Sequence, residues 1–449
     1  MNFVGSYRQS LSPTVPIRTL RAVPSRRLRR WLGRGIGALL AAGAFLAGCA
    51  FLAAGAFLAA GALLAAGCGP RHPEVVRLAV ALPTAAHFGQ TLQEAVELAL
   101  EDAHYQAGSR RVELEVFNTY DPVGAPSLSE ALERQAAERA IADPKVVIYL
   151  GGLSSSQAKA VLPVLNRAGL AMVSPAATWP GLTKNGFGAG EPGMYYPTGR
   201  RHFFRVVPAD DLQAVAAAHW ASELGLRSAF LISTGHTHGE GVLGIFEETA
   251  RDLGIKIVGQ EVLHWNDDPQ VMAEEIAGLS RRVAAAQPDL VYYGAGSGSP
   301  TPELFRELRR RGDFVILGTD SLLSPQLVAD LGLQQADGLR ATHILPPTEL
   351  SAEARSFVER YREREGREPH DSMLCAYEAT KVALLAIGRA QEPNRESVLQ
   401  AMSNLGEISG LFGTWHFTPE GDTTLKAVGG FQVIDGKWTF LKPLSSILP

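Results

Sequence analysis

The sequence predicts an α/β protein made of two doubly wound, Rossmann-like lobes. Short apolar runs rich in β-branched residues, such as VVIYL at 146–150, are typical of buried parallel strands. Segments with apolar residues at helical spacing follow these runs, so strands and helices alternate along the chain. At 449 residues the chain is long enough for this alternation to build two lobes after a leader.

The N-terminal half begins this alternation at residue 75. The apolar run at 75–82 predicts a first strand, and apolar residues at helical spacing follow it. Alternation at 112–116 predicts a second strand. The segment 127–142 predicts a helix with Ser127 and Glu130 as its capping box.

The stretch 146–178 predicts a βαβ unit with hydroxyl-rich turns. GGLSSS follows its first strand, so that Ser154, Ser155 and Ser156 stand where a helix begins, and the second strand at 170–173 ends in SPAAT. Ligands bind outside the carboxyl ends of strands in open α/β sheets, and a helix N-terminus there favours an anion. We therefore expect a ligand carboxylate at these turns. The structural alternative is that the serines only cap the helix.

The second half repeats the pattern after an irregular segment at 179–201, which is rich in glycine and proline and is expected to form a lid or a partner surface. The predicted helices are 211–224, 242–253, 269–286 and 301–311, and two more at 351–365 and 373–390 are expected to belong to the first lobe. The predicted strands are 228–233, 256–260, 290–293 and 314–317, followed by a hairpin and a final strand pair within 413–441.

GGLSSS followed by SPAAT resembles the periplasmic binding proteins for branched-chain amino acids, the type 1 solute-binding proteins of ABC importers. The resemblance extends over residues 75–441. It implies two lobes joined by a three-strand hinge, with lobe 1 formed by 75–203 plus 344–412 and lobe 2 by 204–343 plus 413–449. A hinge between two such lobes forms a ligand trap.

The resemblance also implies an anion site on the first lobe. In this family the serine of the first turn and the threonine of the second hold the substrate's α-carboxylate, and they match Ser155 and Thr178. The backbone at Ala176 is a further expected contact. Leu153 and Ser154, from the same GGLSSS turn, complete this part of the expected site.

Three further contacts are implied by the resemblance. Asp320 matches a family carboxylate that pairs with the substrate's α-ammonium; an Asp helix cap is the structural alternative. Phe88 matches an aromatic that lies against the ligand, and a surface turn aromatic is the alternative. His238 stands where the family typically has a tyrosine, and it is expected to contact the ligand as a neutral or cationic ring.

Catalytic and metal-binding motifs are the alternatives to this binding role. If the segment 236–240 were an extended strand, His236, His238 and Glu240 would share one face and could bind a metal ion. The alternative is a solvated loop. We expect no metal and no cofactor. The sequence has no G-x-S-x-G elbow, phosphate loop or H-E-x-x-H helix, so we do not expect the protein to be an enzyme. A serine hydrolase would need a base within reach of Ser155.

Residues 1–67 resemble an export leader, with a basic cluster followed by a long apolar run. Two segments, LAGC at 46–49 and AAGC at 65–68, resemble the lipoprotein cleavage box. We predict lipidation at Cys68, because polar sequence follows it at once, and a tether at 68–74. Lipidation at Cys49 and an uncleaved membrane anchor are the alternatives.

The leader also hides the charge of the folded part. Its eight arginines and absence of acidic residues leave 34 basic against 46 acidic residues from Cys68 onward, a net charge of about −12. This net negative charge of the folded part argues against nucleic-acid binding. After lipidation at Cys68 only Cys375 remains outside the leader, so no intramolecular disulfide is expected.

The function that the resemblance implies is capture of a small solute, an amino acid or an amide-like molecule, outside the inner membrane. The expected partners are this ligand, an ABC permease in the inner membrane and, through the lipid anchor, the membrane itself. The alternative is a ligand-sensing or envelope-scaffold lipoprotein of the same fold without a permease.

Overall fold

The computed structural model describes residues 73–122, 126–264, 266–295, 300–345 and 351–445. The predicted leader, Cys49, Cys68 and most of the tether lie outside these residues. Within the described part of the chain, no helix combines the length and the apolar character needed to cross a membrane.

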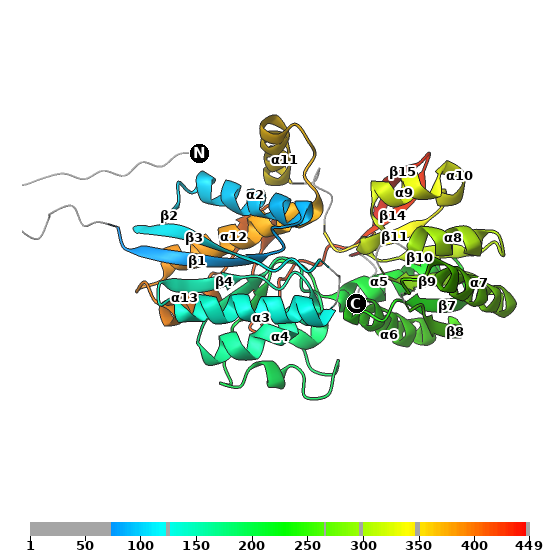
Figure 1. Cartoon of the computed structure of the whole chain (residues 1–449), viewed down its shortest axis with the longest axis horizontal. Coiled ribbons are helices and arrows are strands. Elements are labelled where there is room, and N and C mark those ends of the chain that lie inside the picture. The colour runs from blue at the N-terminus through cyan, green and yellow to red at the C-terminus, as the bar shows by residue number, and fades with distance from the viewer. Residues whose placement is uncertain (1–72, 123–125, 265, 296–299, 346–350, 446–449) are drawn as a thin grey trace, which may run out of the picture. The chain divides into compact units, whose positions relative to one another are not determined.

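The first sheet has six strands in the order β2-β3-β1-β4-β5-β6 (Figure 1). Their bounds are β1 Val75–Leu82, β2 Gln106–Ala107, β3 Arg110–Asn118, β4 Val146–Leu150, β5 Ala171–Ser174 and β6 Phe203–Arg205. All neighbouring pairs are parallel except β2 and β3. Parallel neighbours need long crossover connections, and helices supply them as far as β5, as the strand–helix alternation predicts; the irregular segment after β5 connects it to β6.

Helices cover both faces of this sheet. Their bounds are α2 His87–Asp102, α3 Pro126–Ala142, α4 Ser155–Arg167, α11 Ala352–Glu365, α12 Asp371–Arg389 and α13 Arg395–Ser403. Successive residues of β1 enter different cores: Leu78 and Val80 pack in the cluster that contains α2 and α12, whereas Ala79 and Ala81 pack in the one that contains α3 and α4. A strand buried on both faces explains its unbroken apolar sequence.

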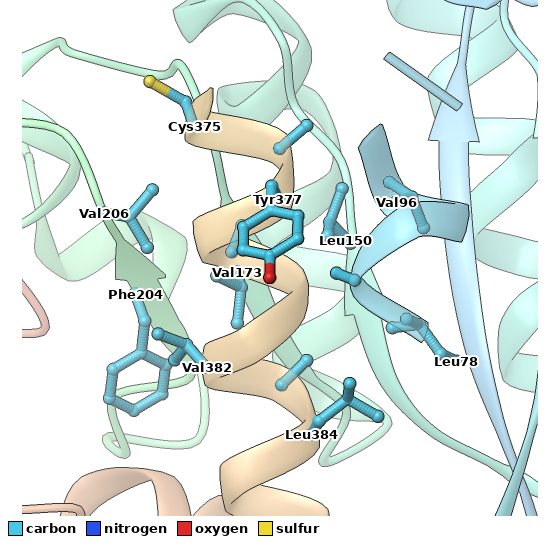
Figure 2. Packing of buried hydrophobic residues seen from close by; sticks show 14 of the residues in the cluster. Leu78, Val96, Leu150, Val173, Phe204, Val206, Cys375, Tyr377, Val382 and Leu384 are labelled. Atoms are coloured by element: carbon cyan, nitrogen blue, oxygen red, sulfur yellow. The ribbon is translucent and has the colours of Figure 1, made fainter. Parts of the chain in front are cut away.

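The helix α12 lies in the first of these cores although it is distant in sequence from the strands it covers. Figure 2 shows Val173 of β5 and Phe204 of β6 beside α12, together with Val96 of α2. Cys375, near the start of α12, belongs to the same cluster. The chain therefore returns to the first sheet after building most of the second.

The second sheet has seven strands in the order β15-β14-β11-β10-β9-β7-β8. Their bounds are β7 Ser228–Ser233, β8 Lys256–Val262, β9 Leu290–Gly294, β10 Val315–Gly318, β11 Arg340–His343, β14 Gly429–Ile434 and β15 Lys437–Pro443. The helices of this half are α5 Asp210–Glu223, α6 Thr237–Asp252, α7 Pro269–Ala286, α8 Thr301–Arg309, α9 Pro325–Leu331 and α10 Leu333–Ala336. The strands from β7 to β11 pair in parallel, and β14 and β15 extend the sheet antiparallel.

The chain passes between the two sheets three times: after β6, after β11, and between the small β12–β13 pair (Ile408–Gly410 and Gly413–Trp415) and β14. The α/β fold with two sheets is confirmed. The lobe limits written from the sequence stay a prediction.

Some local predictions were wrong. The helix predicted from residue 242 begins at Thr237, because the polar residues 237–241 form the first turn of α6 and not a loop. The helix α3 begins at Pro126, so Ser127 lies inside it and is not the predicted N-cap. The helices α9, α10 and α13 were not predicted; α13 is capped by Asn394, whose Oδ1 accepts a hydrogen bond from the Ser397 N–H at 2.9 Å.

Candidate ligand-binding site

A cavity of about 300 Å³, partly open to solvent, is lined by residues that follow strands of both sheets. Seven of the eight predicted contact residues line it: Leu153, Ser154, Ser155, Ala176, Thr178, His238 and Asp320. A larger cavity of about 430 Å³ lies between α7 and α8, and none of the predicted contacts lines it. We therefore take the smaller cavity as the candidate site.

The two adjacent serines in the first turn have different roles. Ser154 is the N-cap of α4: its Oγ accepts a hydrogen bond from the Gln157 N–H at 3.2 Å, and Gln157 Oε1 accepts one from the Ser154 N–H at 3.0 Å. Ser155 is the first residue of the helix, and its Oγ accepts a hydrogen bond from the Trp179 N–H at 3.1 Å. The capping alternative thus applies to Ser154, and the Ser155 hydroxyl proton remains able to donate to a ligand.

The backbone before these serines is fixed by a buried carboxyl group. Glu133 Oε1 accepts hydrogen bonds from the Gly152 N–H at 2.8 Å and from the Tyr149 hydroxyl at 2.9 Å. Burial raises the pKa of Glu133 to about 7, although these two hydrogen bonds lower it in part. Gly152 has φ of 65°, and a Cβ there would lie 2.4 Å from Met172, so the turn requires glycine at this position.

The second turn is attached to the first by Ser174. Its Oγ donates to the carbonyl oxygen of Gly152 at 2.8 Å and accepts from the N–H groups of Ala176 and Ala177 at 3.2 and 2.8 Å. The Ala176 N–H, a predicted ligand contact, is thus already shared with Ser174. Among the described residues, Thr178 Oγ1 makes no hydrogen bond, and this side chain is therefore free for a ligand.

A buried arginine, which the sequence analysis did not single out, hydrogen-bonds to the segment that follows this turn. Arg205 of β6 is fully buried, and its Nε donates to Asp422 Oδ1 at 2.7 Å. Its Nη1 donates to the carbonyl oxygen of Trp179 at 2.8 Å and its Nη2 to Thr183 Oγ1 at 2.7 Å. An arginine directly after apolar strand residues, in HFFR, was the available sequence signal.

The irregular segment after Thr178 is anchored by Trp179. The indole Nε1 donates to Glu191 Oε2 at 2.7 Å, and the Lys159 ammonium group lies 4.5 Å from the ring centroid. Lys159 also pairs with Glu191 Oε1 at 3.0 Å. On the other side, a Cβ at Gly241 of α6 would come within 2.1 Å of the indole. Trp179 therefore bridges α4 of the first half and α6 of the second.

Asp320 opens the short 3₁₀ helix η3 (Asp320–Leu322) that follows β10. Its Oδ1 accepts a hydrogen bond from Gln213 Nε2 at 2.8 Å, and the same Nε2 donates to the carbonyl oxygen of Thr342 at 3.0 Å. The N-cap of η3 is Thr319, and no side chain caps it. The helix-cap alternative for Asp320 is therefore wrong, and its second carboxylate oxygen is open to the cavity.

His238 lies in the first turn of α6 and pairs with a buried carboxylate. Its Nδ1 is 3.2 Å from Asp210 Oδ2, and Asp210 is fully buried. Burial lowers the pKa of His238, but the charge and hydrogen bond of Asp210 and the charge of Asp320 outweigh it and raise the pKa to about 9. The ring is therefore cationic at neutral pH. Its Nε2 has no hydrogen-bond partner among the described residues.

Two sequence hypotheses do not fit this geometry. Phe88 is outside the cavity: its ring stacks on His370 with centroids 5.3 Å apart, and 47% of the residue is exposed. The metal hypothesis required an extended segment, but α6 begins at Thr237, so His236, His238 and Glu240 do not share an extended face. Across the described parts of the chain, no group of three or more His, Cys, Asp or Glu residues could hold a metal ion.

The sequence analysis missed the wall that comes from β11 and α12. It consists of His343, Ile344, Leu345, Asp371, Ser372 and Cys375. No local motif marks these residues, and the available signal was their position at a predicted crossing and at a predicted helix start.

The known proteins can now be compared with this geometry. A family model described as periplasmic binding protein matches residues 83–437. The chain belongs to the type 1 periplasmic binding protein family. As a member of this family, the chain is a non-enzymatic solute-binding protein of the extracytoplasmic type. A curated relative, the leucine-, isoleucine-, valine-, threonine- and alanine-binding protein of Pseudomonas aeruginosa, is 22% identical over 335 residues, which cover 73% of this chain and 82% of the relative.

Solved structures show the same fold for this periplasmic binding protein. The leucine-binding protein of Thermotoga maritima is 25% identical, with a TM-score of 0.67, over 82% of this chain and 98% of that one. A solute-binding protein of Rhodopseudomonas palustris, solved in complex with 3,4-dihydroxybenzoic acid, also has a TM-score of 0.67 at 17% identity, over 82% of this chain and 97% of that one.

Proposed function

We propose that the protein captures an amino acid, or an amide-like molecule of similar size, for an ABC importer while a lipid at Cys68 holds it at the cell envelope. The observation that carries the proposal is that Ser155 and Thr178 of the first half and Asp320 of the second line one cavity. Hydroxyl donors and a carboxylate on separate elements match the two charged groups of a zwitterion.

The carboxylate end is formed by the two hydroxyl groups at the start of α4 and after β5. Ser155 is 5% exposed and Thr178 is 8% exposed, so a ligand carboxylate bound there would be largely shielded from water. Each hydrogen bond to such a charge contributes about 1.5–3 kcal/mol. The N-terminus of the 13-residue helix α4 adds a favourable potential.

The ammonium end is Asp320. Gln213 holds one of its oxygens, and the other remains available to a ligand cation. A ligand without a cation would desolvate this carboxylate and leave it unpaired, which is costly. An aromatic acid such as the one bound by the Rhodopseudomonas palustris protein is therefore disfavoured here. The amino acids in the name of the Pseudomonas aeruginosa relative agree with this reasoning.

His238 supplies a further expected contact. Since Asp210 occupies its Nδ1, the Nε2–H of the cationic ring is the group left to donate to an acceptor on the ligand. Because the charge of the ring is already balanced by Asp210, this contact does not alter the net charge that the ligand must carry.

The experiment is isothermal calorimetry on the full-length protein with amino acids and with simple carboxylates that lack the ammonium group. We expect wild type to bind an amino acid, and Asp320→Asn to lower that affinity by roughly 10- to 150-fold while changing carboxylate binding little. Asp313→Asn, at an exposed carboxylate outside the cavity, is the matched control. Equal losses for both ligand classes would contradict the proposal.

A further inference from the structure

The wall of the cavity that comes from β11 and α12 makes none of the ligand contacts described so far. It is formed by His343 and Ile344 at the end of β11 and by Asp371, Ser372 and Cys375 at the start of α12. A zwitterion whose two charged groups are held by Ser155, Thr178 and Asp320 has only its side chain left to contact this wall. The composition of this wall therefore bears on the side chain of the ligand.

The wall contains a histidine–aspartate pair in which only one of the two carboxylate oxygens is bonded. His343 Nε2 lies 3.0 Å from Asp371 Oδ2, and the His343 side chain is 9% exposed whereas that of Asp371 is 52% exposed. No other side chain in the described part of the chain bonds to the second oxygen of Asp371. This oxygen is thus an acceptor directed at solvent or at a ligand in the cavity.

His343 and Asp371 favour each other's charged form. Burial lowers the pKa of His343, but its hydrogen bond to Asp371 and the charges of Asp371 and Asp320 raise it overall. Burial raises the pKa of Asp371, and the hydrogen bond and charge of His343 lower it overall. Each partner therefore favours the charged form of the other, and in that state the two charges offset each other. An additional ligand charge at this wall would then have no counter-ion of its own.

Resting on the proposed function, we propose that this wall of the cavity recognises an uncharged hydrogen-bond-donating group on the ligand's side chain, a hydroxyl or a carboxamide, through Asp371 as acceptor and Ser372 beside it. Leucine, isoleucine or valine would cover the exposed carboxylate with methyl groups and give it no donor, a desolvation that costs affinity. The protein then selects polar amino acids by that penalty as well as by the hydrogen bond.

The test is calorimetry on the full-length protein with serine, threonine, asparagine and glutamine against leucine, isoleucine and valine. We expect at least one polar amino acid to bind more tightly than all three aliphatic ones. Asp371→Leu should weaken polar binding by roughly 10- to 150-fold and leave or improve leucine binding. Asp371→Asn keeps the shape of the side chain and should weaken the binding of polar amino acids less than Asp371→Leu does. If Asp371→Leu does not fold, the Asp371→Asn variant is the test.

The outcomes separate this inference from the function on which it rests. If the aliphatic amino acids bind more tightly, or if Asp371→Asn and the control Asp313→Asn alter polar binding equally, the inference is overturned and amino-acid capture stands. If no amino acid binds the wild-type protein, the inference and amino-acid capture are both overturned. If Asp371→Leu weakens polar and aliphatic ligands alike, Asp371 is a structural residue and the inference is again overturned.

Discussion

Ser155 Oγ accepts a hydrogen bond from the Trp179 N–H at 3.1 Å, so the first residue of α4 is bonded to the turn that follows β5. This bond fixes the spacing between the Ser155 hydroxyl and Thr178, which is the residue before Trp179. It leaves the hydroxyl proton of Ser155 to be donated elsewhere, because the oxygen is the acceptor in this bond. The proposed carboxylate site is therefore preorganised before a ligand arrives.

Replacing Ser155 by alanine should separate ligand binding from helix capping. The variant loses one donor to the ligand carboxylate, so we expect amino-acid affinity to fall roughly 10- to 150-fold by calorimetry. Ser156→Ala is the matched control, because Ser156 does not line the cavity. If both variants bind like wild type, Ser155 serves only the Trp179 N–H.

Alkaline pH should destabilise the protein through His238. The folded-state pKa of this ring is raised from 6.5 to about 9, so its contribution is complete below pH 6.5 and is lost as pH rises through 9. In urea unfolding, the difference in free energy between wild type and His238→Gln should shrink between these values, by at most about 1.4 kcal/mol per pH unit. A difference that is constant from pH 6.5 to 9.5 would show that the ring is not cationic.

The Arg205–Asp422 pair should matter more to stability than any exposed ion pair. Arg205→Met leaves the Asp422 carboxylate, whose side chain is 10% exposed, with only the Thr183 hydroxyl and the more distant Lys184 ammonium group as partners. We therefore expect the unfolding free energy to fall by about 3 kcal/mol. The control is Arg200→Met, which removes an exposed pair with Glu396 and should cost about 1 kcal/mol or less. Similar losses in urea unfolding would contradict the role given to Arg205.

The mature N-terminus should be a lipidated Cys68. Intact-mass analysis of protein extracted from membranes is expected to give the mass of residues 68–449 plus the lipid. Cys68→Ser should remove the lipid and release the protein from the membrane fraction, whereas Cys49→Ser should change neither. A mature form that begins at Cys49, or retention of the apolar segment, would contradict this prediction.

Much of the fold follows from local sequence. The strands predicted at 75–82, 146–150 and 228–233 have the observed bounds, because each is a short apolar run between turn residues. The start of α6 was missed, since THGEG lacks the apolar spacing of the helix it opens. Helix boundaries depend on tertiary contacts such as that between Gly241 and Trp179, which local patterns do not contain.

The candidate site was predictable where the turns follow their strands directly. Ser155, Thr178 and Asp320 each lie after a strand that the apolar pattern identifies. Asp371 could not be assigned to the cavity in this way, because it begins a helix that returns to the first sheet from the far end of the chain. Phe88 was assigned by resemblance, and its stacking on His370 depends on the same return.

The position of Trp179 has a practical consequence. Its indole contacts Lys159 and Glu191 on one side and leaves no room for a side chain at Gly241 of α6 on the other. Any rotation of one half against the other changes the surroundings of this indole, one of six tryptophans in the chain. The protein thus contains a fluorophore where its two halves meet, and ligand titrations can be followed by intrinsic tryptophan emission without a chemical label.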